Sequence, residues 1–144
     1  MLGMFDVAKT VCKLAGWNLS HLKLQKILYI LQMFYLGEKG KPLFYANFEA
    51  WDFGPVEPSL YKKLKAAGAD SIPRWLFILE DTISRDDPDY EFIENLTNML
   101  LEKSPSFLVN YVHDSKSAWK KVYKKGVKNI PITNEEIRAE YERR

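Results

Sequence analysis

The chain has 144 residues and a formal net charge of +2. This length suits one domain, and this charge is too small to indicate a nucleic-acid partner by itself. Hydrophobic residues make up 47% and charged residues 28%, the usual balance of a globular domain. No apolar run approaches the roughly 18 residues that a membrane span needs, so we expect no membrane association.

The single cysteine, Cys12, excludes an internal disulfide. The N-terminal segment 1–16 mixes charged and apolar residues at helical spacing and lacks the uninterrupted apolar stretch of a signal peptide. One thiol without a signal sequence is typical of a reducing compartment. We therefore expect a cytoplasmic protein.

Two helices are predicted at the start of the chain. Apolar residues over 4–15 fall on one helical face, and Gly16 is a typical C-terminal stop. Asn18 or Ser20 is expected to cap a second helix that ends at Gly37. This second helix is apolar on most of its surface, which is typical of a central helix.

The second helix also carries a polar stripe of Gln25, Tyr29 and Gln32, spaced i, i+4, i+7. Buried amides need hydrogen-bond partners, so one interpretation is an internal network that fixes the helix against the following strand. The other interpretation is a contact surface for another protein. The sequence leaves both open.

Alternating apolar and polar residues over 43–53 predict one or two short strands, with a hairpin turn at 46–47 as one arrangement. The Gly-Pro pair at 54–55 is expected to end the strand. Pro58 suits the first turn of a helix, where its missing N–H costs nothing. That helix is expected to stop near Gly68.

The segment 69–86 shows no clear pattern, and its apolar run 75–79 fits either a strand or a short helix. Start signals for three later helices follow, at 87–88, at 104–105 and at Ser115.

The end of the chain carries the clearest local signal. A short extended piece is predicted at 130–132. Thr133, with Glu136 three residues later, is a capping box that opens a last helix. Taken together, the expected helices and strands predict a mainly α fold with a small β element, which belongs to the α+β class. We expect one compact domain over 1–144, built around the central apolar helix.

A search for catalytic residues finds no constellation. Cys12 lies on an apolar helical face and is interpreted as a core residue. The run His113-Asp114-Ser115 contains the residue types of a triad, but real triads draw on distant positions. The two histidines and one cysteine are too far apart for a metal site. We predict no enzyme activity, no metal and no cofactor. An enzyme of unrecognised type is the weaker alternative, and His113 would be the first residue to mutate in testing it.

Six lysines form a charge cluster over 116–128. The simpler interpretation is a solvated helix face. The functional one is an electrostatic patch for an acidic protein surface or for RNA phosphates. A nucleic-acid site would be better supported by interleaved arginines and exposed aromatic rings, so a nucleic-acid partner is the weaker alternative.

Three blocks of the sequence together resemble the SocA-like Panacea domain. They are LKLQKILY at 22–29, GKPLF at 40–44 and FEAWDFGPV at 48–56. The later elements of the pattern are matched by His113 and Trp119 and by the start of the final helix. The resemblance spans nearly the whole chain, and the segment 69–103 departs from it.

This resemblance implies an antitoxin. Panacea-domain proteins are typically encoded beside a toxin, often in bacterial or prophage genomes, and neutralise it. Most bind the toxin directly, and one branch delivers its toxin to a ClpXP-type protease. The resemblance therefore implies a cognate toxin as partner, bound directly, with the proteolytic adaptor as the alternative output.

Stable protein partners rely on a few large anchors, aromatic side chains above all. We predict the partner-binding residues among exposed rings and amides, and we expect the turn at 54–58 to be a structural corner stiffened by Gly54, Pro55 and Pro58. The candidate partner-binding residues are Gln25, Tyr29, Gln32, Trp51, Asp52, Phe53, Trp75, His113 and Trp119.

Overall fold

A computed structural model describes residues 1–68 and 70–144. The predicted class is confirmed: the fold is mainly α with one two-stranded antiparallel sheet. Residue 69, the first of the segment that the sequence left unassigned, lies outside the described residues. The elements are α1 (Met4–Leu14), α2 (His21–Lys39), β1 (Glu49–Trp51), β2 (Gly54–Val56), α3 (Pro58–Leu64), η1 (Lys65–Ala67), η2 (Arg74–Phe77), α4 (Tyr90–Leu101), α5 (Pro105–His113), α6 (Ala118–Val122) and α7 (Asn134–Arg143).

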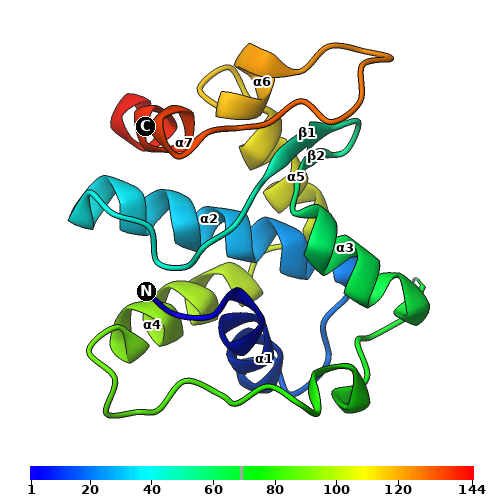
Figure 1. The fold of residues 1–144 in the computed structure, drawn as a ribbon, viewed down its shortest axis with the longest axis vertical. Helices are drawn as coiled ribbons and strands as arrows, with labels where there is room; N and C mark the ends of the chain where they lie inside the picture. Colours follow the sequence, from blue (N-terminus) through cyan, green and yellow to red (C-terminus); the bar gives the residue numbers. More distant parts are fainter. Residues whose placement is uncertain (69) are drawn as a thin grey trace.

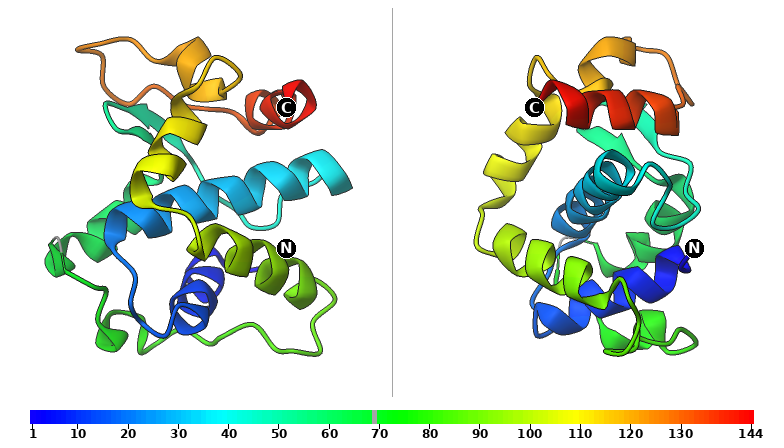
Figure 2. Two further views of the ribbon diagram at one scale, coloured as in Figure 1. Left: turned by 180° about the vertical axis from the view of Figure 1, so that it is seen from behind. Right: turned by 90° about the vertical axis from the view of Figure 1, so that its left-hand side faces the viewer.

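Helix α2 crosses the middle of the molecule, as its apolar surface predicts (Figure 1). Helices α1 and α4 lie on one side of it, and α7, α6 and the hairpin lie on the other (Figure 2). Leu24, Ile27, Leu28 and Leu31 are fully buried along α2. Because α2 packs against α1, α3, α4, α5, α7 and β2, it forms the centre of the core.

The end of α2 differs from the prediction. Ser20 caps the start, where its hydroxyl accepts a hydrogen bond from the Lys23 amide at 3.3 Å. The helix passes through Gly37 and ends at Lys39, with Gly40 in the left-handed region at φ +73°. A Cβ on Gly37 would lie 2.0 Å from the Tyr141 ring. Gly37 therefore makes room for α7 and does not stop the helix.

The hairpin also differs from the prediction. It turns at residues 52–53, where Trp51 pairs with Gly54, and not at 46–47. The amides of Leu43 and Phe44 donate to the Gln32 side chain at 2.9 and 3.4 Å. Since a side chain satisfies this backbone, the alternating pattern at 43–47 does not require a strand ladder.

Two helix starts lie two residues later than predicted. Helix α4 begins at Tyr90, because the Asp87 carboxylate accepts the Asp89 amide at 2.8 Å and makes a turn there. Helix α6 is capped by Ser117, not Ser115, and it ends at Val122.

Helix α3 ends at Leu64, and the 3-10 helix η1 carries the chain on to Ala67, next to the predicted stop at Gly68. Further predicted elements are confirmed. Helix α5 follows Ser104, whose hydroxyl accepts the Phe107 amide at 3.1 Å. The Thr133 capping box opens α7. The extended piece 130–132 lies along the free edge of β1, since the Ala50 amide donates to the Ile130 carbonyl at 2.9 Å. The apolar run at 75–79 contains the end of a short 3-10 turn, η2.

Candidate functional site at the hairpin tip

The turn between β1 and β2 is held in place by residues from α6 and its C-terminal end. The Trp119 indole N–H donates to the Trp51 carbonyl at 2.6 Å. The Tyr123 hydroxyl donates to the Asp52 carboxylate, and this bond raises the pKa of Tyr123. These two long-range bonds fix the direction in which the turn points.

Gly54 lets the hairpin approach the core closely. Its φ of +108° lies in the region that favours glycine. A Cβ there would be 2.9 Å from His113 Cε1 and 3.1 Å from Lys26 Nζ. Gly54 and Pro55 do not end the strand as predicted, because they begin the second strand, β2 (Gly54–Val56). Pro58 is the first residue of α3. The predicted corner thus runs directly from strand to helix.

A buried lysine lies behind this corner. The Lys26 side chain is 0% exposed, and its ammonium donates to the Pro55 carbonyl at 3.1 Å. It forms no ion pair with the residues that the structure describes. Burial lowers the pKa of Lys26 to about 7, because a charged amine loses its hydration there.

The polar stripe of α2 lies in the interior. The Gln25 amide bonds both backbone groups of Glu57, accepting its N–H at 2.9 Å and donating to its carbonyl at 3.2 Å. The Gln32 amide donates to the Phe44 carbonyl at 2.8 Å. The Tyr29 hydroxyl donates to Glu140 at 2.7 Å. This placement favours the internal-network interpretation, and none of the three side chains reaches the surface.

Sequence reasoning missed Glu140, a fully buried carboxylate on α7. It accepts hydrogen bonds from Tyr29, from the Ala118 amide at 2.9 Å and from the Arg144 guanidinium at 2.8 Å. Burial and this carboxylate raise the pKa of Tyr29 well above its usual value. The i, i+4 spacing of Glu140 and Arg144 in the sequence was the signal that could have predicted this ion pair.

Glu57 was missed as well. Its carboxylate caps α3 by accepting the Ser59 and Leu60 amides at 2.8 and 3.1 Å. Its other oxygen accepts the Asn47 amide at 2.9 Å. Pro58 at the first helical position was the available signal for this helix start, whereas glutamate is not among the preferred N-cap residues.

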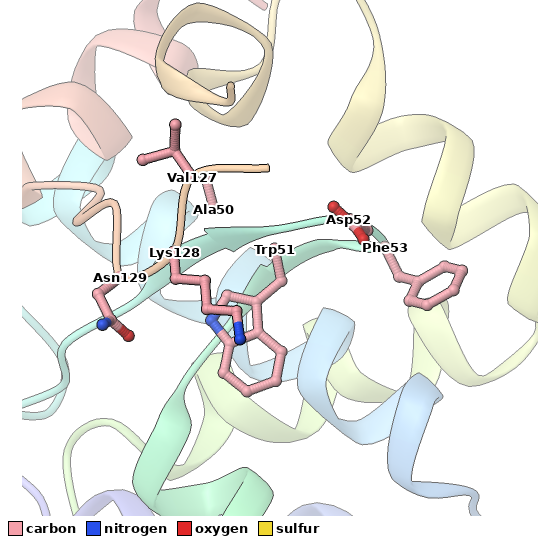
Figure 3. A pocket seen from close by; sticks show the side chains of 7 residues that line it. All are labelled: Ala50, Trp51, Asp52, Phe53, Val127, Lys128 and Asn129. Atoms are coloured by element: carbon pink, nitrogen blue, oxygen red, sulfur yellow. The ribbon is translucent and has the colours of Figure 1, made fainter. Parts of the chain in front are cut away.

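The exposed part of the hairpin tip consists of Trp51, Asp52 and Phe53. Phe53 is 73% exposed, whereas Trp51 is half-buried, with its ring 4.9 Å from that of Tyr61. Trp51 lines a hollow of about 360 Å³ beside the loop 127–129. In Figure 3 the Trp51 and Lys128 side chains point to the same side of the hairpin, and Phe53 points away from them.

His113 and Trp119 lie beneath the hairpin and support it. Their rings are 4.1 Å apart, and the His113 Nδ1–H donates to the Val109 carbonyl at 2.6 Å. Trp119 is buried and His113 half-buried. The structure therefore brings Trp51, Asp52, Phe53, His113 and Trp119 together, the last two as supports.

Trp75 is not part of this group. It belongs to η2, which lies at the other end of the longest axis of the molecule (Figure 1). It is 61% exposed and lines a different hollow, beside Trp17 and Arg74. Two separate exposed surfaces thus carry a tryptophan.

Three further features bear on catalysis, metal binding and membrane insertion. Burial raises the pKa of the Cys12 thiol to about 12, so the thiolate that nucleophilic attack requires is scarce. Within residues 1–68 and 70–144, no group of three or more His, Cys, Asp or Glu side chains is placed to hold a metal ion. Within the same ranges no helix is both long and apolar enough to cross a membrane.

Comparison with known proteins gives a family match. Residues 24–120 match the family described as antitoxin SocA-like, Panacea domain. A similar protein is the antitoxin SocA of Caulobacter vibrioides (strain NA1000 / CB15N), 35% identical over 113 residues. That alignment covers 70% of this chain and 58% of the relative. No solved structure matches.

Proposed function

Because the chain belongs to the SocA-like Panacea family, we propose that it is an antitoxin that neutralises a cognate toxin by direct protein–protein contact. We place the contact with the toxin at the hairpin tip. We also propose that residues 1–144 form one domain, since α1 and α7, which lie outside the matched range, both pack on α2. We place its action in the cytoplasm, where a single cysteine stays reduced.

One observation carries the choice of surface: a large aromatic ring, Phe53, is exposed at a turn that two long-range hydrogen bonds hold to the rest of the domain. Large rings at the centre of an interface supply much of its binding energy. A rigid backbone loses little conformational entropy when the partner binds. The two bonds from Trp119 and Tyr123 restrain the backbone of residues 51 and 52.

Co-expression with the protein encoded beside this chain tests the class. Rescue of growth, together with co-purification of the two proteins, supports an antitoxin. Direct neutralisation further requires that the purified chain alone inhibits the purified toxin. If toxin is instead lost only in cells that contain the protease, the chain is a proteolytic adaptor.

Trp51→Ala tests the surface, with Trp75→Ala as the matched control at the other end of the molecule. We expect Trp51→Ala to abolish neutralisation and Trp75→Ala to retain it. Circular dichroism must show that both variants fold, because an unfolded Trp51→Ala protein would identify this ring as a core residue only. Loss of neutralisation in Trp75→Ala alone would move the site to η2.

A further inference from the structure

The segment 116–128, which contains α6 and the loop after it, carries an uncompensated cationic surface beside the hairpin tip. Six lysines lie between residues 116 and 128, and no Asp or Glu occurs from 115 to 132. All six side chains are exposed. None forms an ion pair with any residue in the described ranges.

The two carboxylates on the hairpin are engaged by ring donors. Asp52 accepts the Tyr123 hydroxyl, and Glu49 accepts the Trp51 indole N–H at 3.0 Å. Neither carboxylate is within ion-pair distance of a lysine of this loop. The lysines therefore remain available for negative charge on another molecule.

The cationic loop borders two hollows. One hollow, of about 360 Å³, lies between Trp51 and Val127. The other, of about 510 Å³, is lined by Lys121 and Lys124. They share the three residues 127–129, which form a ridge between them. Val127 on that ridge is 51% exposed.

The ridge has a defined backbone shape. Gly126 and Asn129 both have positive φ, at +80° and +60°, and they bracket Val127 and Lys128. Glycine and asparagine are the residues that adopt this conformation most readily. The sequence thus favours the turn that brings Val127 and Lys128 to the lining of both hollows.

We propose that this surface receives an acidic segment of the partner protein that carries one large apolar side chain. The apolar side chain occupies the hollow between Trp51 and Val127, and neighbouring carboxylates pair with Lys121, Lys124 and Lys128. This inference rests on the proposed antitoxin function, because it names the chemistry of the toxin segment that the hairpin tip binds.

The surroundings favour a protein segment over a nucleic acid. Residues 115–132 contain no arginine, the side chain that grips phosphate with two hydrogen bonds and stacks on bases. The Trp119 and Tyr123 rings stack on each other with centroids 4.5 Å apart, and Trp119 is only 8% exposed. Bases would find no open ring between these two.

Charge reversal tests the proposal. The variant Lys124→Glu with Lys128→Glu is compared with Lys39→Glu plus Lys41→Glu, which changes the charge equally at exposed lysines near the end of α2. Binding to the purified protein encoded beside this chain is measured by calorimetry at low and high salt. We expect at least a ~10-fold weaker Kd and a smaller salt dependence for the loop variant only.

A second arm of the experiment identifies the paired groups. Carbodiimide coupling joins lysine amines to carboxylates in direct contact, so mass spectrometry of the coupled complex should find Lys121, Lys124 or Lys128 joined to Asp or Glu of the partner. Val127→Asp should weaken binding by at least ~10-fold, because it places a carboxylate in the apolar hollow.

The outcomes separate the two proposals. If the wild-type chain does not bind the neighbouring gene product, the proposed function itself fails. If the wild type binds but the loop variants, folded by circular dichroism, bind equally well, only the acidic-segment proposal is wrong. It is also wrong if a single-stranded RNA or DNA oligonucleotide binds the loop and displaces the partner.

Discussion

The interior stripe of α2 and the hairpin tip differ in where their side chains find partners. Along α2, the polar groups of Gln25, Tyr29 and Gln32 bond to groups of the same chain. At the tip, Phe53 is open to solvent, and on the neighbouring loop Lys128 has no ion-pair partner among the described residues. Changes in the interior should therefore affect folding, and changes at the tip should affect binding without affecting folding.

Glu140→Ala should have the largest effect on stability. It leaves Arg144, the Tyr29 hydroxyl and the Ala118 amide without their buried acceptor. Removing one partner of a buried charged pair costs about 3–5 kcal/mol. Urea unfolding measures the change, with Glu142→Ala, an exposed residue of the same helix, as the control. Equal midpoints for the two variants would contradict the network.

Gly37→Ala should destabilise by a smaller amount, roughly 1–3 kcal/mol, because the new methyl group overlaps the Tyr141 ring. Helix propensity alone predicts the opposite sign, a gain of about 1 kcal/mol for alanine over glycine. Thermal or urea unfolding decides between them, with Glu38→Ala as an exposed neighbour for comparison. A more stable Gly37→Ala protein would show that α7 does not pack there.

Lys26→Met should change how stability depends on pH. Since the pKa of Lys26 falls from 10.5 to about 7 on folding, the unfolded chain binds more protons between these values. Stability therefore rises with pH above 7 in the wild type, by at most about 1.4 kcal/mol per pH unit. The methionine variant should lack this rise. Parallel stability curves for the two proteins from about pH 6 to about 8.5 would contradict burial of a titrating amine.

Local signals predicted part of the fold from sequence. The capping box of Thr133 and the Ser104-Pro105 start of α5 depend on neighbours within one turn, and both were found correctly. Gly37 was misinterpreted because its role depends on Tyr141, more than a hundred residues away in the chain. Periodicity alone cannot reveal such a contact.

The candidate site, like the fold, was predictable from the sequence only in part. The aromatic run around Trp51 and Phe53 could be identified in the sequence, but the position of the turn could not, since it is fixed by Trp119 and Tyr123 from α6 and its end. The uncompensated charge of the lysine loop also required the structure. Only the ion-pair pattern shows that no carboxylate of the described chain neutralises it.

Phe53→Ala should have the smallest effect on stability and a large effect on binding. Ile78→Ala is its matched control, because the two side chains are 73% and 74% exposed and Ile78 lies beside η2 at the other end of the molecule. Neither variant should change the unfolding midpoint measurably, since exposed side chains contribute little to folding.

The most direct test of the account is the affinity of these two variants for the purified protein encoded beside this chain. We predict that Phe53→Ala weakens binding by about 2 kcal/mol, or roughly 30-fold, while Ile78→Ala binds like the wild type. Wild-type affinity for a folded Phe53→Ala protein, or a loss confined to Ile78→Ala, would contradict the assignment of the hairpin tip as the binding surface.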